Sequence, residues 1–212
     1  PKTDEEKMKD VVIDNIEDFE DEELYEDEKF ITPEQAIQVL NLFMNTPMML
    51  PVCLATFMSL RRSEIAGILK NKVDTQNMKL TINASRVRCG NKTIYKKKNK
   101  TKTSTRNLYI PKIMLKILEE DEKRQQKNRE IFGDKYIESK FLCVMDNGSP
   151  VRVDYMTVKF KQVFDKFITE QTEKAIKNGT EFNFPYVTLH KLRHLNISAL
   201  LANGAYLTDV RD

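Results

Sequence analysis

Apolar positions recur at helical spacing along the segment that follows residue 30. Thr32, Pro33 and Gln35 supply an N-cap residue, a first-turn proline and a capping-box partner, and apolar residues follow them at helical intervals. The mostly apolar run 48–60 predicts a buried helix, and a second short helix follows that ends near Leu69. We therefore expect three helices in this segment.

The pattern then changes to that of strands. Residues 79–83, 93–97 and 106–110 are short stretches with β-branched or aromatic side chains, separated by polar segments. They predict a three-stranded antiparallel meander whose connections carry most of the lysines. A further short strand is expected at 141–144.

Helical spacing returns in the second half of the chain. Pro111 opens one helix, Asp154 is expected to cap a long helix that residues 178–179 end, and a last helix covers 189–203 with Gly204 in the C′ role. The predicted fold class is therefore α+β, a mainly helical domain with a small three-stranded antiparallel sheet.

Composition limits the class of protein. Of the 212 residues 40% are apolar and 32% are charged, which excludes collagen, low-complexity and wholly disordered chains. The longest mostly apolar stretch, 48–60, is too short to cross a bilayer, so we expect a soluble protein. The first residues do not show a basic segment followed by an apolar one, and the three cysteines are odd in number and widely spaced, so we expect a reducing cytoplasm.

Charge divides the chain into two parts. Residues 1–28 carry 3 Lys against 14 acidic residues, a net charge of −11, and the remaining residues carry a net charge of +14. We interpret residues 1–29 as an acidic interdomain linker and 30–212 as one basic domain. Since the first residue is Pro1 rather than methionine, we also expect a fragment of a longer protein.

A long stretch of the basic domain contains only positively charged side chains among its charged residues. Between Asp74 and Glu119 there is no acidic residue and there are twelve cations. A solvated surface usually mixes signs, so the run indicates a nucleic-acid partner, with an ordinary soluble surface as the alternative. The candidate DNA contacts are Arg86, Arg88, Lys96, Lys97, Lys98, Lys102 and Arg106.

Two clusters combine charge with helical spacing. If the helix includes Arg61, that arginine shares the inward stripe with Ile65, where it needs an anionic partner; alternatively it pairs with Glu64 at i+3. His190, Arg193 and His194 share one helix face. Two histidines at i and i+4 could hold zinc, but no third ligand is evident and the neighbouring cations disfavour a dication, so we expect no metal. An ordinary helix surface is the other alternative.

A third cluster, residues 100–106 (KTKTSTR), precedes the last predicted strand. A lysine in a hairpin connection reaches a phosphate bound at the sheet edge, although such a run also occurs in solvated loops. The sequence contains no Gly-rich phosphate loop and shows no paired-carboxylate hydrolase or cysteine protease pattern.

Taken in order, the three clusters resemble the catalytic domain of tyrosine recombinases, the phage and conjugative-transposon integrases. Residues 60–65 (LRRSEI) resemble the family's first arginine motif, with Ser59 where the family usually has glycine. Residues 100–106 are similar to its hairpin-lysine motif, with Asn99 in place of a frequent proline. Residues 190–194 (HKLRH) match its His-x-x-Arg box.

The resemblance implies a reaction in which a tyrosine attacks a DNA phosphodiester, forms a 3′-phosphotyrosyl bond and releases a 5′-hydroxyl. Arg61 and Arg193 would clamp the nonbridging oxygens without a metal or other cofactor. Lys100 would protonate the leaving oxygen, and His190 would bind the phosphate or handle the nucleophile's proton. The supporting residues would be Glu64 and His194.

The family's nucleophile is expected beyond Asp212, so the domain is interpreted as truncated at its C-terminal end. Tyr206 follows Arg193 too closely to be the nucleophile, and Tyr136, Tyr155 and Tyr186 precede Arg193. The implied partners are double-stranded DNA, further copies of the chain in a tetrameric synapse, and an excisionase, in a bacterial cytoplasm. The alternatives are a DNA-binding module without chemistry and a type IB topoisomerase-like enzyme.

Overall fold

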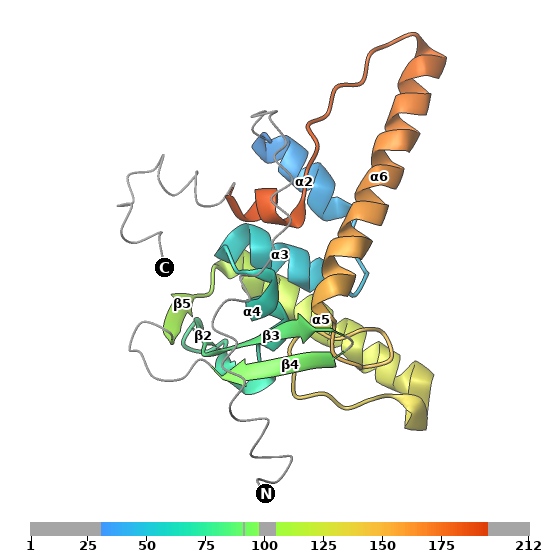
Figure 1. The fold of residues 1–212 in the computed structure, drawn as a ribbon. Helices are drawn as coiled ribbons and strands as arrows, with labels where there is room; N and C mark the ends of the chain where they lie inside the picture. The colour runs from blue at the N-terminus through green and yellow to red at the C-terminus, as the bar shows by residue number, and fades with distance from the viewer. Residues whose placement is uncertain (1–30, 91, 98–104, 195–212) are drawn as a thin grey trace, which may run out of the picture.

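A computed structural model describes residues 31–90, 92–97 and 105–194 of the chain. Five helices have defined bounds in it: α2 (Pro33–Asn41), α3 (Met49–Met58), α4 (Arg62–Gly67), α5 (Lys112–Phe132) and α6 (Val153–Asn178). Residues 189–194 are also helical, and 3₁₀ turns η1 (Lys70–Lys72) and η2 (Gly133–Lys135) follow α4 and α5. Figure 1 shows α3 and α4 between α2 and the strands.

The first helices form for the reasons that the sequence predicts. The Thr32 hydroxyl accepts the Gln35 backbone N–H at 3.2 Å, and the Gln35 side chain accepts the Thr32 N–H at 2.9 Å, so the predicted capping box is confirmed. Helix α3 is apolar on all sides and almost entirely buried, and it lies in the hydrophobic core. It ends at Ser59, which has a left-handed backbone (φ 52°, ψ 33°).

The strands pair differently from the predicted meander. Strand β2 (Lys79–Ile82) lies between β1 (Val73–Asp74) and β5 (Arg106–Tyr109) in one antiparallel sheet, and β3 (Ala84–Cys89) pairs only with β4 (Lys92–Lys97) in a separate hairpin. The predicted three-strand order was therefore wrong, because β3 was missed and β4 turns back onto it. The stretch 141–144 makes only isolated bridges.

The β3–β4 hairpin packs tightly on α4. At Gly67 an added Cβ would lie 2.7 Å from the Ser85 Cα, closer than side-chain carbons approach backbone. Only glycine therefore allows this spacing between helix and strand. The edge-to-face contact of Tyr95 with Phe141, 5.7 Å between ring centroids, holds the second strand of the hairpin against the 139–144 segment.

Helix α6 begins after Arg152 rather than at the predicted cap, Asp154, and ends as predicted at Asn178, with Gly179 left-handed at φ 64°. Figure 1 shows the second half of α6 extending away from the other elements and the chain returning beside it. Aromatic rings hold the returning segment: Phe164 lies 6.1 Å from Phe184 and 5.5 Å from Tyr186, between ring centroids.

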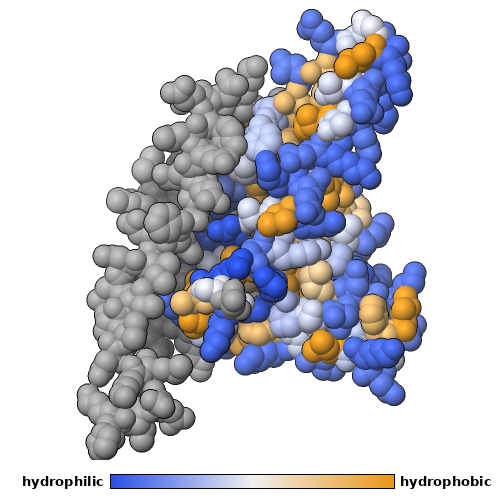
Figure 2. Space-filling model, turned by 45° about the vertical axis from the view of Figure 1, so that its right-hand side comes forward, coloured by the Kyte–Doolittle hydropathy of each residue, from blue (hydrophilic) through white to orange (hydrophobic). Residues whose placement is uncertain are grey.

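The predicted fold class, mainly helical with small antiparallel sheets, is confirmed. The linker 1–29, Lys98, Lys100, Lys102 and the end of the predicted 189–203 helix lie outside the described residues. No helix in the described ranges has the length and apolar character needed to cross a membrane. On the face drawn in Figure 2, apolar residues are scattered among hydrophilic ones.

Candidate functional site

The first and last sequence clusters meet at the end of α3. Arg193 donates from Nε to the backbone carbonyl of Ser59 at 2.8 Å, although the two residues are 134 positions apart. Thr188 fixes the short helix that carries Arg193, since its hydroxyl accepts the Lys191 backbone N–H at 3.1 Å. Because Ser59 stands two positions before Arg61, this contact brings the two arginine motifs to one place.

Arg61 does not point inward as its predicted helical position required. Helix α4 begins at Arg62, so Arg61 is an N-cap residue with an extended backbone (φ −70°, ψ 147°), and it is exposed. Ile65 and Ile68 keep their predicted burial. The expectation of an inward Arg61 was wrong because the helix starts one residue later, which leaves Arg61 exposed at the N-terminus of α4.

Glu64 is the buried acid of this region. Its carboxylate, 1% exposed, accepts Arg106 Nη1 at 2.8 Å and Arg106 Nη2 at 2.9 Å, and it also accepts the Arg61 backbone N–H at 3.1 Å. Arg106, predicted as a DNA contact, thus uses both of its terminal nitrogens inside the protein. The sequence did not predict this ion pair between Arg106 and Glu64, because the two residues are 42 positions apart.

The two histidines of the chain lie together on the same short helix. His190 and His194 are exposed, and their Nε2 atoms lie 2.6 Å apart, so one ring donates and the other accepts. The rings meet edge to face with centroids 4.3 Å apart. In the described part of the chain, no three His, Cys, Asp or Glu side chains gather as a metal site would require.

Arg86 is a structural arginine. It is 8% exposed, donates to the carbonyl oxygens of Val151 at 3.1 Å and Ala66 at 3.4 Å, and lies 4.5 Å from the centre of the Phe141 ring. Burial lowers the pKa of its guanidinium. The prediction that Arg86 contacts DNA does not fit this buried position. The sequence around Arg86 could not indicate its burial, because the carbonyl groups that it binds are 20 and 65 residues away.

Other predicted cations remain at the surface of the hairpin. Arg88, with its side chain 53% exposed, donates to Asp154 at 3.1 Å and to the Gly90 carbonyl at 2.9 Å. Arg152 donates to the same Asp154 carboxylate, and the two arginines lower its pKa. Lys96 is exposed on β4. The Arg88, Arg152 and Asp154 group carries a net positive charge next to the hairpin.

A lysine that sequence reasoning did not select lies near the histidine helix. Lys161 Nζ, on α6, donates to the Tyr186 hydroxyl at 2.9 Å, and Lys191 Nζ donates to the Tyr186 carbonyl at 3.2 Å. Lys161 sits among mixed charges on a helix, so no sequence signal could have singled it out.

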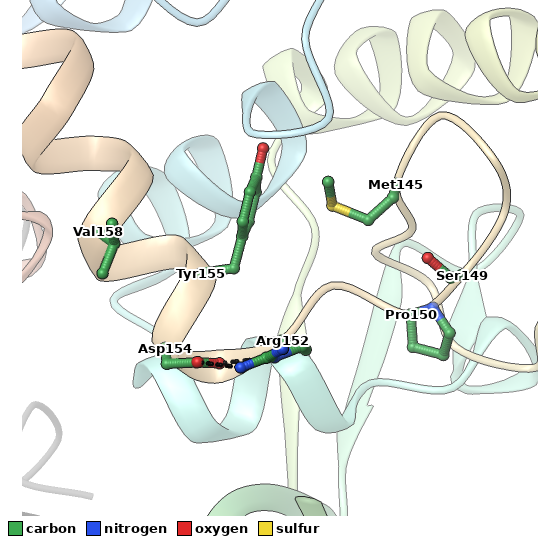
Figure 3. A pocket seen from close by; sticks show the side chains of 7 residues that line it. All are labelled: Met145, Ser149, Pro150, Arg152, Asp154, Tyr155 and Val158. Atoms are coloured by element: carbon green, nitrogen blue, oxygen red, sulfur yellow. Dashed lines mark hydrogen bonds and ion pairs between the residues drawn. The ribbon is translucent and has the colours of Figure 1, made fainter. Parts of the chain in front are cut away.

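A small pocket of about 300 Å³ lies between the 145–150 turn and the start of α6 (Figure 3). Figure 3 shows the Arg152–Asp154 ion pair along one side of it and the Tyr155 ring above. The pocket contains none of the predicted site residues. Its lining residues are Met145, Ser149, Pro150, Arg152, Asp154, Tyr155 and Val158.

Solved structures share this fold. The Tn1549 transposon integrase in complex with transposon right end DNA matches with a TM-score of 0.66 and 19% sequence identity over 86% of this chain and 56% of that one. The same integrase in complex with a circular intermediate DNA matches with a TM-score of 0.64 and 18% sequence identity, over 86% of this chain and 56% of that one. The XerA recombinase matches with a TM-score of 0.51 and 15% sequence identity, over 86% of this chain and 54% of that one.

These matches concern structure. No protein-family model matches the sequence, and no curated protein is detectably similar to it. The chain spans about half the length of each of these three solved structures. It has the fold of a tyrosine recombinase catalytic domain.

Proposed function

We propose that this chain is the catalytic domain of a site-specific recombinase, an integrase of a mobile element, which cleaves and rejoins DNA through a 3′-phosphotyrosyl intermediate. The single observation that carries the proposal is the bond from Arg193 to Ser59, since it unites two arginine motifs that the sequence separates by more than a hundred residues. The fold supports it: the similar Tn1549 integrase was solved with transposon DNA.

The geometry suits phosphate chemistry. A pentavalent phosphorus accumulates charge on its nonbridging oxygens, and preorganised guanidinium groups stabilise that charge. In this proposal Arg61, exposed at the start of α4, and Arg193, oriented by Ser59, provide the two guanidinium groups. His190 binds the phosphate or handles the proton of the nucleophile, supported by His194, and Lys100 protonates the leaving 5′-oxygen.

The surface around these residues provides DNA contacts. Arg88 and Lys96 are exposed on the β3–β4 hairpin, and they fit the electrostatic, salt-dependent part of duplex binding. The remaining predicted contacts, Lys97, Lys98 and Lys102, belong to the same basic run of sequence. Arg86 and Arg106 are excluded from this set because the protein itself uses their guanidinium groups.

Further parts of the proposal follow from the resemblance. Residues 30–212 form the catalytic domain and residues 1–29 an acidic linker to an arm-binding and core-binding region. Double-stranded DNA is the substrate, four copies assemble on it in a synapse, and an excisionase directs the reaction toward excision. The enzyme works in a bacterial cytoplasm.

The test is a covalent adduct. Full-length protein is incubated with duplexes taken from the DNA around its own gene, and a denaturing gel separates protein that is covalently bound to DNA. An adduct and the joining of two cognate duplexes support a recombinase. Binding without adduct indicates a DNA-binding module, and relaxation of any supercoiled plasmid without partner exchange indicates a topoisomerase.

A further inference from the structure

Arg106 and Glu64 form a bidentate ion pair that links strand β5 to helix α4. The two N–O distances are 2.8 and 2.9 Å, and the side-chain exposures are 20% for Arg106 and 1% for Glu64. Two parallel charge-assisted hydrogen bonds fix both the distance and the plane of the two groups. A contact of this kind holds its partners in one relative orientation.

The same carboxylate also reaches Arg61. Glu64 Oε2 accepts the backbone N–H of Arg61 at 3.1 Å, so one oxygen is shared by the Arg106 fork and the residue that starts α4. Arg106 is itself held in register by β2, where it stands opposite Ile82. The contacts therefore run from the sheet through Arg106 and Glu64 to the backbone of Arg61.

On this geometry we propose that Arg106 is a positioning residue for Arg61, and that it does not contact DNA. The inference rests on the proposed function, in which Arg61 binds the scissile phosphate. Arg106 fixes the orientation of the buried Glu64 carboxylate, and the carboxylate then holds the backbone N–H that sets the direction of the Arg61 side chain.

The fork fixes the plane of the carboxylate. Loss of the Arg106 guanidinium removes two hydrogen bonds to the buried Glu64 side chain, so its oxygens are no longer held in one orientation. The hydrogen bond from the Arg61 N–H to Oε2 then weakens. A clamp displaced by about 1 Å loses on the order of 10²-fold in rate.

The experiment compares Arg106→Gln with Arg88→Gln in the full-length protein. We expect Arg106→Gln to slow single-turnover cleavage at saturating DNA on the order of 10²-fold, with the salt dependence of DNA binding unchanged. Arg88→Gln, which removes an exposed arginine of the neighbouring hairpin, should lower the slope of log K against log salt by about 0.9. An equal loss of slope in Arg106→Gln would make Arg106 a DNA contact and overturn the inference.

A positioning role is separated from a purely structural one by rate and amplitude. Partial misfolding lowers the fraction of active protein, which reduces the amplitude of the single-turnover reaction. A displaced Arg61 side chain instead lowers the rate constant of the molecules that react. Glu64→Gln and Arg106→Gln should also be non-additive, the double variant being no slower than the slower single one. Additive losses or a loss of amplitude alone would overturn the inference.

Arg106→Lys covers the case in which Arg106→Gln fails to fold. Lysine keeps the charge but cannot form the bidentate fork, so the cleavage rate constant of Arg106→Lys should lie between those of wild type and Arg106→Gln. If Arg106→Gln does not fold, the rate constant of Arg106→Lys should still be lower than that of wild type. Arg106→Lys at the wild-type rate would overturn the inference. If the wild-type protein itself forms no adduct, the proposed function fails; if wild type cleaves and Arg106→Gln cleaves equally fast, only the positioning role fails.

Discussion

Arg193 donates a hydrogen bond from Nε–H to the carbonyl oxygen of Ser59, the residue with a left-handed backbone that ends α3. Serine at φ 52° occupies a conformation that glycine adopts more easily, which gives a physical reason for glycine at this position in the family that the sequence resembles. The left-handed residue turns the chain so that its carbonyl meets Arg193 and the next residues begin α4. Backbone geometry at Ser59 thus orients the carbonyl oxygen that accepts the hydrogen bond from Arg193.

The first prediction concerns the phosphate clamp. In the full-length protein, Arg61→Ala or Arg193→Ala should reduce cleavage far more than DNA binding, because each removes a preorganised donor to the transition state. The expected cost is about 2.7 to 4 kcal/mol of barrier, measured as single-turnover cleavage at saturating DNA.

Arg62→Ala is the matched control. Arg62 is adjacent to Arg61 but its guanidinium bonds the Thr157 hydroxyl on α6, so its removal should change stability more than the rate of cleavage. Equal cleavage defects at Arg61 and Arg62 would contradict the assignment.

Local signals in the sequence predicted much of the helical part of the fold. The Thr32–Gln35 capping box lies within one turn, and the end of α6 at Gly179 follows from a single residue type, so both could be read from the sequence. Strand β3 was missed because its sequence, ASRVRC, has one β-branched residue, Val87, and so gives a weak strand signal. Strand β2 pairs with β5, Ile82 opposite Arg106, and local patterns do not specify a pairing over that separation.

The site was predictable in its residue types and not in its pairings. His190 and His194 stand together because a helix brings i and i+4 together. The buried position of Arg86 depends on Phe141 and Val151, and the fork of Arg106 depends on Glu64, all distant in sequence. Charge alone therefore could not show that the protein itself binds these two guanidinium groups.

A second prediction follows from the basic run. Duplex binding should weaken as salt rises, and replacing Lys96, Lys97 and Lys98 together by glutamine should flatten the plot of log K against log salt by about 0.9 for each phosphate contact removed. Fluorescence anisotropy at several salt concentrations measures the slope. Binding that does not depend on salt would show that the run is only a solvated surface.

The third prediction concerns the histidine pair. His194→Ala removes a hydrogen-bond partner of His190. The barrier to cleavage should rise by about 0.5–1.5 kcal/mol, the contribution of one hydrogen bond, which slows cleavage roughly 2- to 12-fold. His194→Gln retains a hydrogen-bonding group and should lose less. Alanine and glutamine variants with the same rate would indicate that the contact has no role in cleavage.

A fourth prediction tests the core through its cysteines. Burial raises the pKa of Cys53 to about 12 and raises that of the Cys143 thiol well above its usual range, so both stay protonated at pH 8 and unreactive. Cys89, half-buried at the end of β3, is the accessible thiol of the three. Iodoacetamide should label Cys89 in the native protein and the other two only after denaturation, as peptide mass spectrometry would show; early labelling of Cys53 would contradict the packing of α3.

The last prediction concerns the nucleophile and the metal. Full-length protein should form its covalent DNA adduct in excess EDTA, because Arg61 and Arg193 take the charge-stabilising role that a metal ion would otherwise have. Phenylalanine at Tyr136, Tyr155 or Tyr186 should leave the adduct intact. Burial raises the pKa of the first two phenols, which disfavours the phenolate, and Tyr186 precedes Arg193 in the sequence, where the family motif has no nucleophile. If one of these changes abolishes the adduct, that tyrosine is the nucleophile and the motif alignment fails; if cleavage requires a divalent ion, the recombinase proposal itself fails.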